Sequence, residues 1–358
     1  MDSTGLTIQA MLDEAVSGRI FPCGVLMRLN RGGNPEYYCA GSTQYGGGFV
    51  PNATSLFDLA SLTKVIATTP LAMLLFEAGN LDLDRPVASW LADFEAADHP
   101  EWRARITPRM LLAHSAGFVP SLPFHRTFAG MGDRAEKQRL VRHGTLQSPP
   151  NAKTAYSDIG MMVMGQVVEA ILKKHLDMAA KELLFAPLGM EDTGFKPIAS
   201  SRCVPTEEIA ERPGEYWQGI VHDENARWLG GVSAHAGLFS CARDLALFAR
   251  MLLAGGAPLF PSGRTLELFT SPANLVPGSE RCLGWTQWSK MPGAFGHTGF
   301  TGISLWIDMT KGIATLLLTN AVHPHRECKQ NGYFAWRDRL HLLASSGYDV
   351  PVVAGDNG

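Results

Sequence analysis

The residues best suited to chemistry form a Ser-x-x-Lys motif, Ser61-Leu62-Thr63-Lys64, at the start of a segment with strong helical periodicity. Positions i and i+3 lie about one helical turn apart, so the serine hydroxyl and the lysine ammonium should face the same way. A helix amino terminus carries partial positive charge and free N–H groups, which stabilise an alkoxide or a carbonyl oxygen. A lysine with a lowered pKa could accept the serine proton. By itself the motif also fits a serine helix cap followed by a solvated lysine.

A second motif, Tyr156-Ser157-Asp158, stands just before a long apolar helical pattern. A loop ahead of a helix can project a phenol and a carboxylate into a cleft. The phenol could relay a proton to a leaving group, and Ser157 could do the same in a second arrangement. The alternative is a helix cap by Ser157 or Asp158 with Tyr156 packed beside it.

A third motif, Gly296-His297-Thr298-Gly299, leads into Phe300 and then into a predicted strand. Its small residues would let a substrate lie along a strand edge, and a backbone N–H there could contribute to an oxyanion hole. His297 and Thr298 could hold a substrate carboxylate. An ordinary turn is the alternative interpretation.

Hydrophobic periodicity predicts the elements that must position these motifs. Pro70 should kink or divide the helix that begins at the first motif. Strands at both ends of the chain, with helices between them, predict one sheet built from both termini and a helical insert. Helices are expected over 6–18, 62–79, 107–113, 158–174, 178–184, 242–253 and 326–344, and strands over 24–29, 37–40, 283–288, 302–307 and 313–318.

Composition excludes several functional classes. The chain has 358 residues, of which 46% are hydrophobic and 18% charged, a balance typical of globular proteins. The formal charge is −3 with no basic block, so a nucleic-acid partner is not expected. The amino-terminal residues show no signal peptide, and no apolar run of about 18 residues predicts a membrane span. These features predict a cytoplasmic chain.

The six cysteines are scattered, with no Cys-x-x-Cys pair. Zinc and redox sites need close ligand or thiol pairs, so free and mostly buried thiols are expected.

The three motifs, in this order, resemble the serine β-lactamase and penicillin-binding protein family. The tyrosine in the second motif is similar to that of class C β-lactamases, D-alanyl-D-alanine carboxypeptidases, D-amino-acid amidases and related esterases. Three flanking segments add to the likeness: 57–60 resembles the family's entry strand, 106–117 its helix-to-loop segment, and 237–245 its return into the sheet domain.

The resemblance implies an α/β (α+β) fold with an antiparallel sheet flanked by helices, plus a helical domain. The sheet domain would comprise 1–65 and 235–358, the mainly α-helical domain 66–234, and the active-site cleft would lie between them.

The resemblance also implies roles for individual residues. Ser61 would be the nucleophile, Lys64 its proton partner, and Tyr156 the general base and then the acid, without metal or organic cofactor. The order of proton transfers between Lys64 and Tyr156 stays open, since the pair would titrate as a coupled unit. The backbone N–H groups of Ser61 and Phe300 would form the oxyanion hole. The substrate-binding residues would be Asp158, His297, Thr298, Gly299 and Phe300.

Two departures from the family pattern bear on the substrate. His297 stands where β-lactamases usually have lysine, and it should hold a carboxylate less firmly because histidine is only partly charged near neutral pH. Asp158 stands where asparagine is usual, so it cannot donate an amide hydrogen bond and could pair with Lys64 instead. Small carboxyl esters or amides are therefore the leading substrates. A β-lactamase or D-alanyl-D-alanine carboxypeptidase is the alternative, followed by a non-catalytic β-lactam sensor.

Two further motifs suggest other site types. Residues 113–117 resemble the nucleophile elbow of an α/β-hydrolase, but a helix is expected before Ser115 where the elbow needs a strand. Residues 221–227 collect His, Asp and Glu without a known metal-ligand spacing, so a hydrogen-bonded loop near the cleft is expected. His114, Ser115 and His235 are predicted to be structural.

Overall fold

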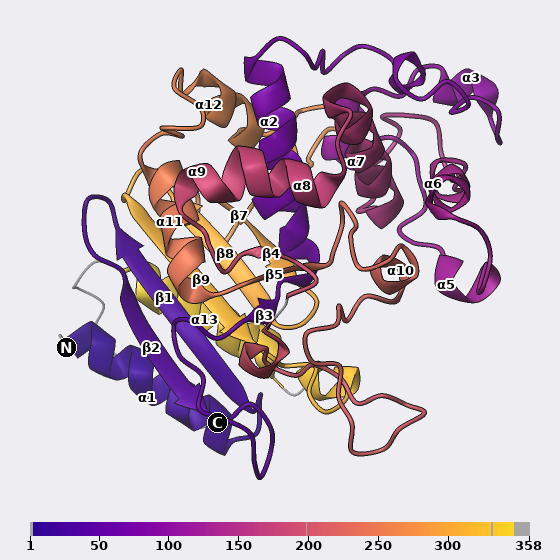
Figure 1. Ribbon diagram of the computed structural model, residues 1–358. Coiled ribbons are helices and arrows are strands. Elements are labelled where there is room, and N and C mark those ends of the chain that lie inside the picture. The colour runs from indigo at the N-terminus through magenta and orange to yellow at the C-terminus, as the bar shows by residue number, and fades with distance from the viewer. Residues whose placement is uncertain (1–2, 198, 331, 347–358) are drawn as a thin grey trace.

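The computed structural model describes residues 3–197, 199–330 and 332–346. Its centre is a six-stranded antiparallel sheet with the order β2-β1-β9-β8-β7-β6 (Figure 1). The amino-terminal hairpin pairs with the last strand of the chain, which confirms the prediction of one sheet built from both termini. The strands are β1 (Cys23–Asn30), β2 (Glu36–Gly41), β6 (Thr286–Gln287), β7 (Ala294–Gly299), β8 (Ile303–Asp308) and β9 (Ile313–Thr319).

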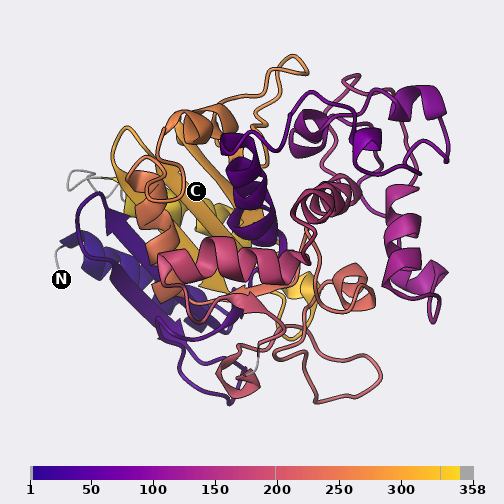
Figure 2. The same cartoon turned by 45° about the horizontal axis from the view of Figure 1, so that its top comes forward.

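Helices cover both faces of this sheet (Figures 1 and 2). The terminal helices α1 (Ser3–Ser17) and α13 (Tyr333–Ser345) pack together on one face, and α11 (Ala242–Leu253) packs on the other. Successive side chains of a strand point to opposite faces. Accordingly, Leu26 joins the α1–α13 cluster, while Val25 joins the main core on the α11 face.

The middle of the chain is mainly helical, as predicted, and gathers at one side of the sheet (Figure 1). One buried cluster runs from Met27 in the sheet to Val163 in α7, so the two parts share a core. The predicted domain boundaries stay a prediction. The helices here are α3 (Pro100–Arg103), α4 (Pro108–Leu112), α5 (Phe124–Thr127), α6 (Arg134–Arg142), α7 (Asp158–Leu172), α8 (Leu176–Ala180), α9 (Ala186–Leu188) and α10 (Glu224–Trp228), with α12 (Arg264–Thr270) later in the chain, and the short turns are η3 (Val87–Ser89), η4 (Lys181–Phe185) and η5 (Ser200–Arg202).

The helix that carries the first motif changes type along its length. It begins as the 3₁₀ turn η1 (Ala60–Leu62), continues as the π-helical turn η2 (Lys64–Thr68), and becomes α2 (Thr69–Glu77). Pro70 lies in the first turn of α2, where its missing N–H is tolerated, and the helix changes from π to α just before it. The wide π turn thus begins at Lys64, the last residue of the first motif.

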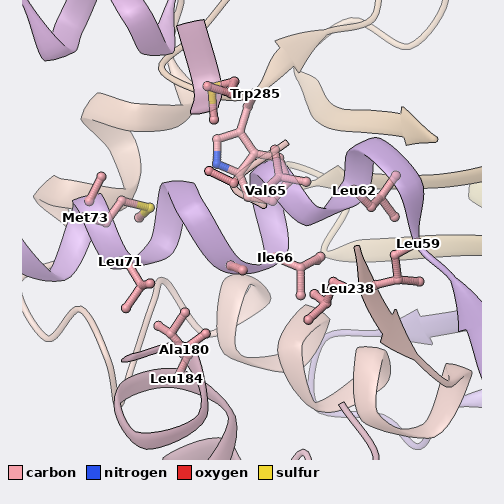
Figure 3. Packing of buried hydrophobic residues seen from close by; sticks show 14 of the residues in the cluster. Leu59, Leu62, Val65, Ile66, Leu71, Met73, Ala180, Leu184, Leu238 and Trp285 are labelled. Atoms are coloured by element: carbon pink, nitrogen blue, oxygen red, sulfur yellow. The ribbon is translucent and has the colours of Figure 1, made fainter. Parts of the chain in front are cut away.

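This helix is the centre of the core. Its apolar side chains pack against Leu184, Leu238 and Trp285, which come from three different elements or loops (Figure 3). By length and composition Ala60–Glu77 could cross a membrane, but 78% of it is buried inside the protein. Burial accounts for its apolar character.

Two sequence predictions were wrong in detail. The strand expected over 283–288 is only Thr286–Gln287, because Gly284 adopts a positive φ of 84° that ends the extended backbone. The closing helix is divided into η6 (Arg326–Gln330) and α13, with Gly332 at φ 75° before α13. The segment after 237, expected to return into the sheet domain, forms a strand of a second, small sheet of order β3-β5-β4. This sheet is made of β3 (Phe57–Asp58), β5 (Leu238–Ser240) and β4 (Gly194–Phe195).

A buried histidine between α13 and the sheet should make stability depend on pH. His341 lies between the hydroxyls of Ser304 and Thr315, at 2.6 and 2.8 Å, and burial lowers its pKa from 6.5 to about 3. As the pH falls below 6.5, His341 becomes protonated in the unfolded chain while it stays neutral in the folded one. The free energy of unfolding therefore decreases. We expect a loss of about 1.4 kcal/mol at pH 5.5 relative to neutral pH. Urea unfolding of wild type and His341→Gln measures this, and an equal pH dependence in both would contradict it.

Candidate active site

A rigid turn presents Ser61. The buried carboxylate of Asp58 accepts hydrogen bonds from the N–H groups of Ala60 (2.8 Å) and His222 (2.6 Å). Ala60 adopts a left-handed φ of 43°, a costly conformation for a residue with a Cβ, directly before the nucleophile motif. The hydroxyl of Thr301 donates to the backbone oxygen of Asp58 at 2.8 Å, which ties the β7–β8 turn to this segment. The surroundings thus hold Ser61 in one place.

Lys64 is completely buried behind Ser61. Its Nζ lies 3.0 Å from Ser61 Oγ, 2.8 Å from Asp158 Oδ1 and 3.0 Å from the backbone oxygen of His235. The pairing of Asp158 with Lys64 that the sequence suggested is therefore present. Burial by itself lowers the pKa of Lys64, but the charge of Asp158, supported by Tyr156, outweighs it and raises the pKa above the usual 10.5. The expectation of a lowered lysine pKa was wrong, because it left the carboxylate out.

The second motif forms the amino terminus of α7. Ser157 is the helix cap: its Oγ accepts from the Gly160 N–H at 3.2 Å and donates to the Val119 oxygen at 2.8 Å. The cap interpretation is confirmed for this residue, and Ser157 is not free to relay protons. Its backbone N–H donates to Nδ1 of His114 at 3.1 Å. These contacts fix the start of α7, and with it the segment that carries Tyr156.

Tyr156 is half-buried among nitrogen-bearing side chains. Its ring centroid is 4.9 Å from Lys64 Nζ and 5.1 Å from the guanidinium carbon of Arg281. The rings of His114 and His297 lie 4.7 and 5.8 Å away. Lys64 of the first motif and His297 of the third therefore both lie beside the ring of Tyr156 in the second.

The third motif lies on β7, so it is a strand rather than a turn. His297 is buried, and its Nδ1 lies 2.8 Å from the oxygen of Thr298, which can only accept, so Nδ1 carries the proton. Burial, reinforced by Arg281 and Lys64, lowers the pKa of His297 to about 3. The imidazole is neutral at physiological pH, and its Nε2 is a buried acceptor with no protein partner among the described residues.

The motifs border a cleft of about 290 Å³, here called the Ser61 cleft. Of the predicted site residues, Lys64 and Asp158 stand behind this surface and the others line it. Three cations also line it that the sequence reasoning missed, Arg281, Lys329 and Arg337, because no motif surrounds them. Its lining residues are Ser61, Tyr156, Arg281, Thr286, His297, Thr298, Gly299, Phe300, Lys329, Phe334 and Arg337.

The three cations differ in their partners. Lys329 donates to the backbone oxygen of Phe300 at 2.7 Å, and Arg337 pairs with Asp338 at 2.7 Å. Within the described part of the chain, Arg281 forms no ion pair, and its buried Nη1 has no hydrogen-bond partner. Burial lowers the pKa of Arg281, yet guanidinium remains charged in proteins. A partly buried cation without an ion-pair partner is suited to bind an anion.

A second hollow of about 200 Å³ shares Ser61 and Phe300 with the cleft. It contains part of the 221–227 segment, whose carboxylates already have partners. Asp223 caps α10 and lies 2.9 Å from His235 Nε2, and Glu224 lies 2.7 Å from Arg326. The segment is hydrogen-bonded and adjoins the cleft as expected, although half of it is a helix. The opposite ring nitrogen of His235 contacts the Ser233 hydroxyl at 2.7 Å, so this histidine is structural as predicted.

Elsewhere, Asp192, Cys241 and Asp244 lie close enough together to hold a metal ion. Both carboxylates are engaged, because Asp192 pairs with Arg202 and Arg243, and Asp244 accepts from the Asp192 N–H. Burial raises the pKa of Cys241 to about 12, which opposes the thiolate that a metal needs. All six cysteines are free, and four of them are buried, as predicted.

Comparison with known proteins agrees with this geometry. The family model described as Beta-lactamase matches residues 21–337. The N-acetylmuramyl-L-alanine amidase of Bacillus subtilis (strain 168) is 33% identical over 305 residues, which cover 75% of this chain and 68% of that protein. A putative D-alanyl-D-alanine carboxypeptidase of Escherichia coli O157:H7 is 30% identical over 309 residues, covering 75% and 70%.

Solved structures share the fold. EstCE1, a hydrolase with promiscuous acyltransferase activity, superposes with a TM-score of 0.76 at 21% identity, over 94% of this chain and 98% of that one. The class C β-lactamase of Rhodobacter sphaeroides gives 0.71 at 17% identity, over 94% and 97%. The chain belongs to the Beta-lactamase family and is a serine hydrolase of that family.

Proposed function

We propose that this protein hydrolyses a small carboxyl ester or amide whose leaving group carries a carboxylate, through an acyl-Ser61 intermediate. One observation carries the choice of substrate. The Ser61 cleft is lined by three cations, and none of the described residues that line it is acidic. Such a cleft raises the local concentration of anions and disfavours cations.

The proposed reaction uses residues that lie together at the Ser61 cleft. Lys64 donates to Ser61 Oγ and orients the hydroxyl. Ser61 attacks the carbonyl carbon, and the N–H groups of Ser61 and Phe300 stabilise the oxyanion. Tyr156 transfers a proton to the leaving group, and water then hydrolyses the acyl-serine. No metal or organic cofactor enters these steps.

The position of Tyr156 orients the substrate in the cleft. The group that leaves must lie on the side of Tyr156, because it receives its proton there. Arg281 stands over the same phenol ring and lacks a counterion, so it is the proposed partner of the leaving-group carboxylate. His297 was expected to hold this carboxylate, but its free Nε2 is an acceptor and cannot donate to an anion.

A D-alanyl peptide is the second candidate substrate. Its leaving group, D-alanine, carries a carboxylate, and a similar protein is named a putative D-alanyl-D-alanine carboxypeptidase. The amidase and EstCE1 names point to amide and ester chemistry in the same family. A β-lactam substrate remains a weaker alternative, a non-catalytic sensor is weaker still, and a cytoplasmic location stays a sequence prediction.

A matched pair of esters tests the carboxylate preference. We expect the butyryl ester of 4-hydroxybenzoate to be hydrolysed with a kcat/KM about tenfold higher than that of the butyryl ester of methyl 4-hydroxybenzoate, since a charged hydrogen bond contributes about 1.5–3 kcal/mol. Arg281→Met should remove this preference while leaving hydrolysis of the neutral ester largely unchanged. Arg85→Met, at an exposed arginine that does not line the cleft, is the control and should keep the preference. Equal rates for both esters in the wild-type protein would contradict the proposal.

A further inference from the structure

We propose that Asp158 is a positioning residue that holds Lys64 as a permanent ammonium, which leaves proton relay to Tyr156. The inference rests on the proposed function, because it assigns the protons of that reaction. It differs from the role expected for Lys64 as a proton acceptor.

The contacts of Lys64 Nζ account for a full ammonium. An ammonium has three N–H donors and no lone pair. Three oxygens surround Nζ within 3.0 Å: the Ser61 hydroxyl, the His235 backbone oxygen and the Asp158 carboxylate. A neutral amine has only two N–H groups, so it could serve all three contacts only by accepting a hydrogen bond from the Ser61 hydroxyl. That arrangement would leave an uncharged, fully buried amine 2.8 Å from the Asp158 carboxylate, and the carboxylate favours the charged ammonium instead.

Asp158 lies where the backbone favours a negative charge. It is the first residue of the 15-residue helix α7, where the helix dipole favours a negative charge. Its backbone N–H donates to the Pro120 oxygen at 2.8 Å, which anchors the residue. Its side chain is 22% exposed while that of Lys64 is 0% exposed, so water screens the pair only from one side. Asparagine, usual at this position in the family that the sequence resembles, would offer the same shape without the charge.

The other charged or titratable groups around Lys64 do not replace Asp158. Burial lowers the pKa of both His114 and His297, so these histidines are neutral. They carry no negative charge that could stabilise the Lys64 ammonium. Asp223 attracts Lys64 from a greater distance but is paired with His235. The groups facing Lys64 are Tyr156 before α7, Asp158 on α7, Asp223 before α10, His235 before β5, His297 on β7, His114 after α4 and Arg281 before β6.

With Lys64 fixed as a donor, the protons still balance. As Ser61 Oγ bonds to the carbonyl carbon, its proton passes to Tyr156 Oη while the phenol, in the same step, gives its own proton to the ester oxygen or amide nitrogen, which then leaves. In the second half, water adds to the acyl carbon, and one water proton passes to the phenol while the phenolic proton passes to Ser61 Oγ, which then departs from the acyl carbon. Lys64 keeps its three protons throughout and stabilises the oxygen of Ser61 when negative charge develops there.

The pH dependence of Asp158→Asn tests this assignment. We expect wild type to keep its kcat/KM for p-nitrophenyl butyrate up to about pH 10. In Asp158→Asn, burial of Lys64 is no longer opposed, so the loss of activity at alkaline pH should move down by about 1–3 pH units. The rate at neutral pH should not rise. An unchanged alkaline limit, or a faster neutral rate in the variant, would overturn the proposal.

Asp84→Asn is the matched control. It removes a carboxylate that pairs with Arg109 outside the cleft, so its pH profile should equal that of wild type. The neutral ester avoids any contribution from Lys329, which could affect anionic substrates because burial lowers its pKa to about 8.

A second measurement does not depend on turnover. Carbon-13 NMR of lysine Cε, with the Lys64 signal assigned through Lys64→Arg, reports the charge of Lys64 in wild type directly. The proposal expects a pKa at or above the ordinary 10.5, and a lower value would overturn it. If the ester were not hydrolysed while Lys64 stayed charged, the proposed function would fail and the ion-pair assignment would stand.

Discussion

Ser61→Ala is expected to lower kcat for p-nitrophenyl butyrate by on the order of 10⁴-fold or more, since removal of a serine nucleophile leaves only the oxyanion hole and substrate binding. Ser61 Oγ lies 3.0 Å from the buried Nζ of Lys64, and Ser61 lines both hollows, which supports its proposed role as nucleophile. Steady-state rates measure the loss. Intact-mass spectrometry of wild type after a rapid quench should show the acyl group, and the variant should not carry it.

Ser115→Ala is the control for this experiment, because residues 113–117 were the competing nucleophile motif. The Ser115 hydroxyl lies 2.8 Å from Asn151 Oδ1 and is buried, and helix α4 stands directly before the segment, as the sequence predicted. We expect this variant to keep most of the activity. Activity that survives in Ser61→Ala and disappears in Ser115→Ala would show that the nucleophile had been wrongly assigned.

The candidate active site was predictable where its geometry is local. The spacing of Ser61 and Lys64 fixes their relative position on one turn, and Ser157 lies at a helix cap because its residue type favours that place. The sheet was also predictable in outline, since alternating apolar segments at both ends of the chain need partners. Its short strands were not, because glycines such as Gly284 end them through backbone conformations that hydrophobic periodicity does not record.

The electrostatics of the site depend on contacts between segments that are distant in the sequence. These contacts were harder to predict from the sequence. The backbone oxygen that accepts from Lys64 belongs to His235, 171 residues further on, and any residue type could have supplied it. Arg281 has no motif around it, and only the fold brings it over Tyr156. The pKa of Lys64 is raised because its pairing with Asp158 outweighs the effect of burial. The sequence suggested this pairing, but the rise in the pKa was not predicted from it.

These contacts give the two halves of the site different tasks. Behind Ser61, the pair of Lys64 and Asp158 forms a fixed, buried dipole that does not need to change charge during the reaction. In front of it, the phenol of Tyr156 faces the cleft and the leaving group. Under the proposed mechanism the charge of Lys64 is already in place and only Tyr156 passes protons. The site therefore needs little reorganisation when the serine oxygen becomes negative.

Tyr156→Phe should therefore have the second large effect. We expect kcat to fall by about 10²–10⁴-fold, the range for loss of a positioned proton donor and acceptor. The decrease should be larger for a poor leaving group such as a simple alkyl ester than for p-nitrophenol, because p-nitrophenolate leaves without a proton. A comparison of p-nitrophenyl butyrate with ethyl butyrate, in both proteins, measures the difference. If Lys64 carried the proton instead, the two substrates would lose similar, small factors.

The phenylalanine variant isolates the hydroxyl from the ring. The phenol ring contacts His114, His297 and Arg281 through its face and edges, and phenylalanine keeps these contacts. Folding should therefore be unaffected, which thermal unfolding can verify. Tyr216→Phe, on a ring that packs against His323, is the matched control and should retain wild-type rates on both esters. A Tyr156→Phe protein that hydrolysed ethyl butyrate within about threefold of wild type would exclude the phenol as the proton relay and return that role to Lys64.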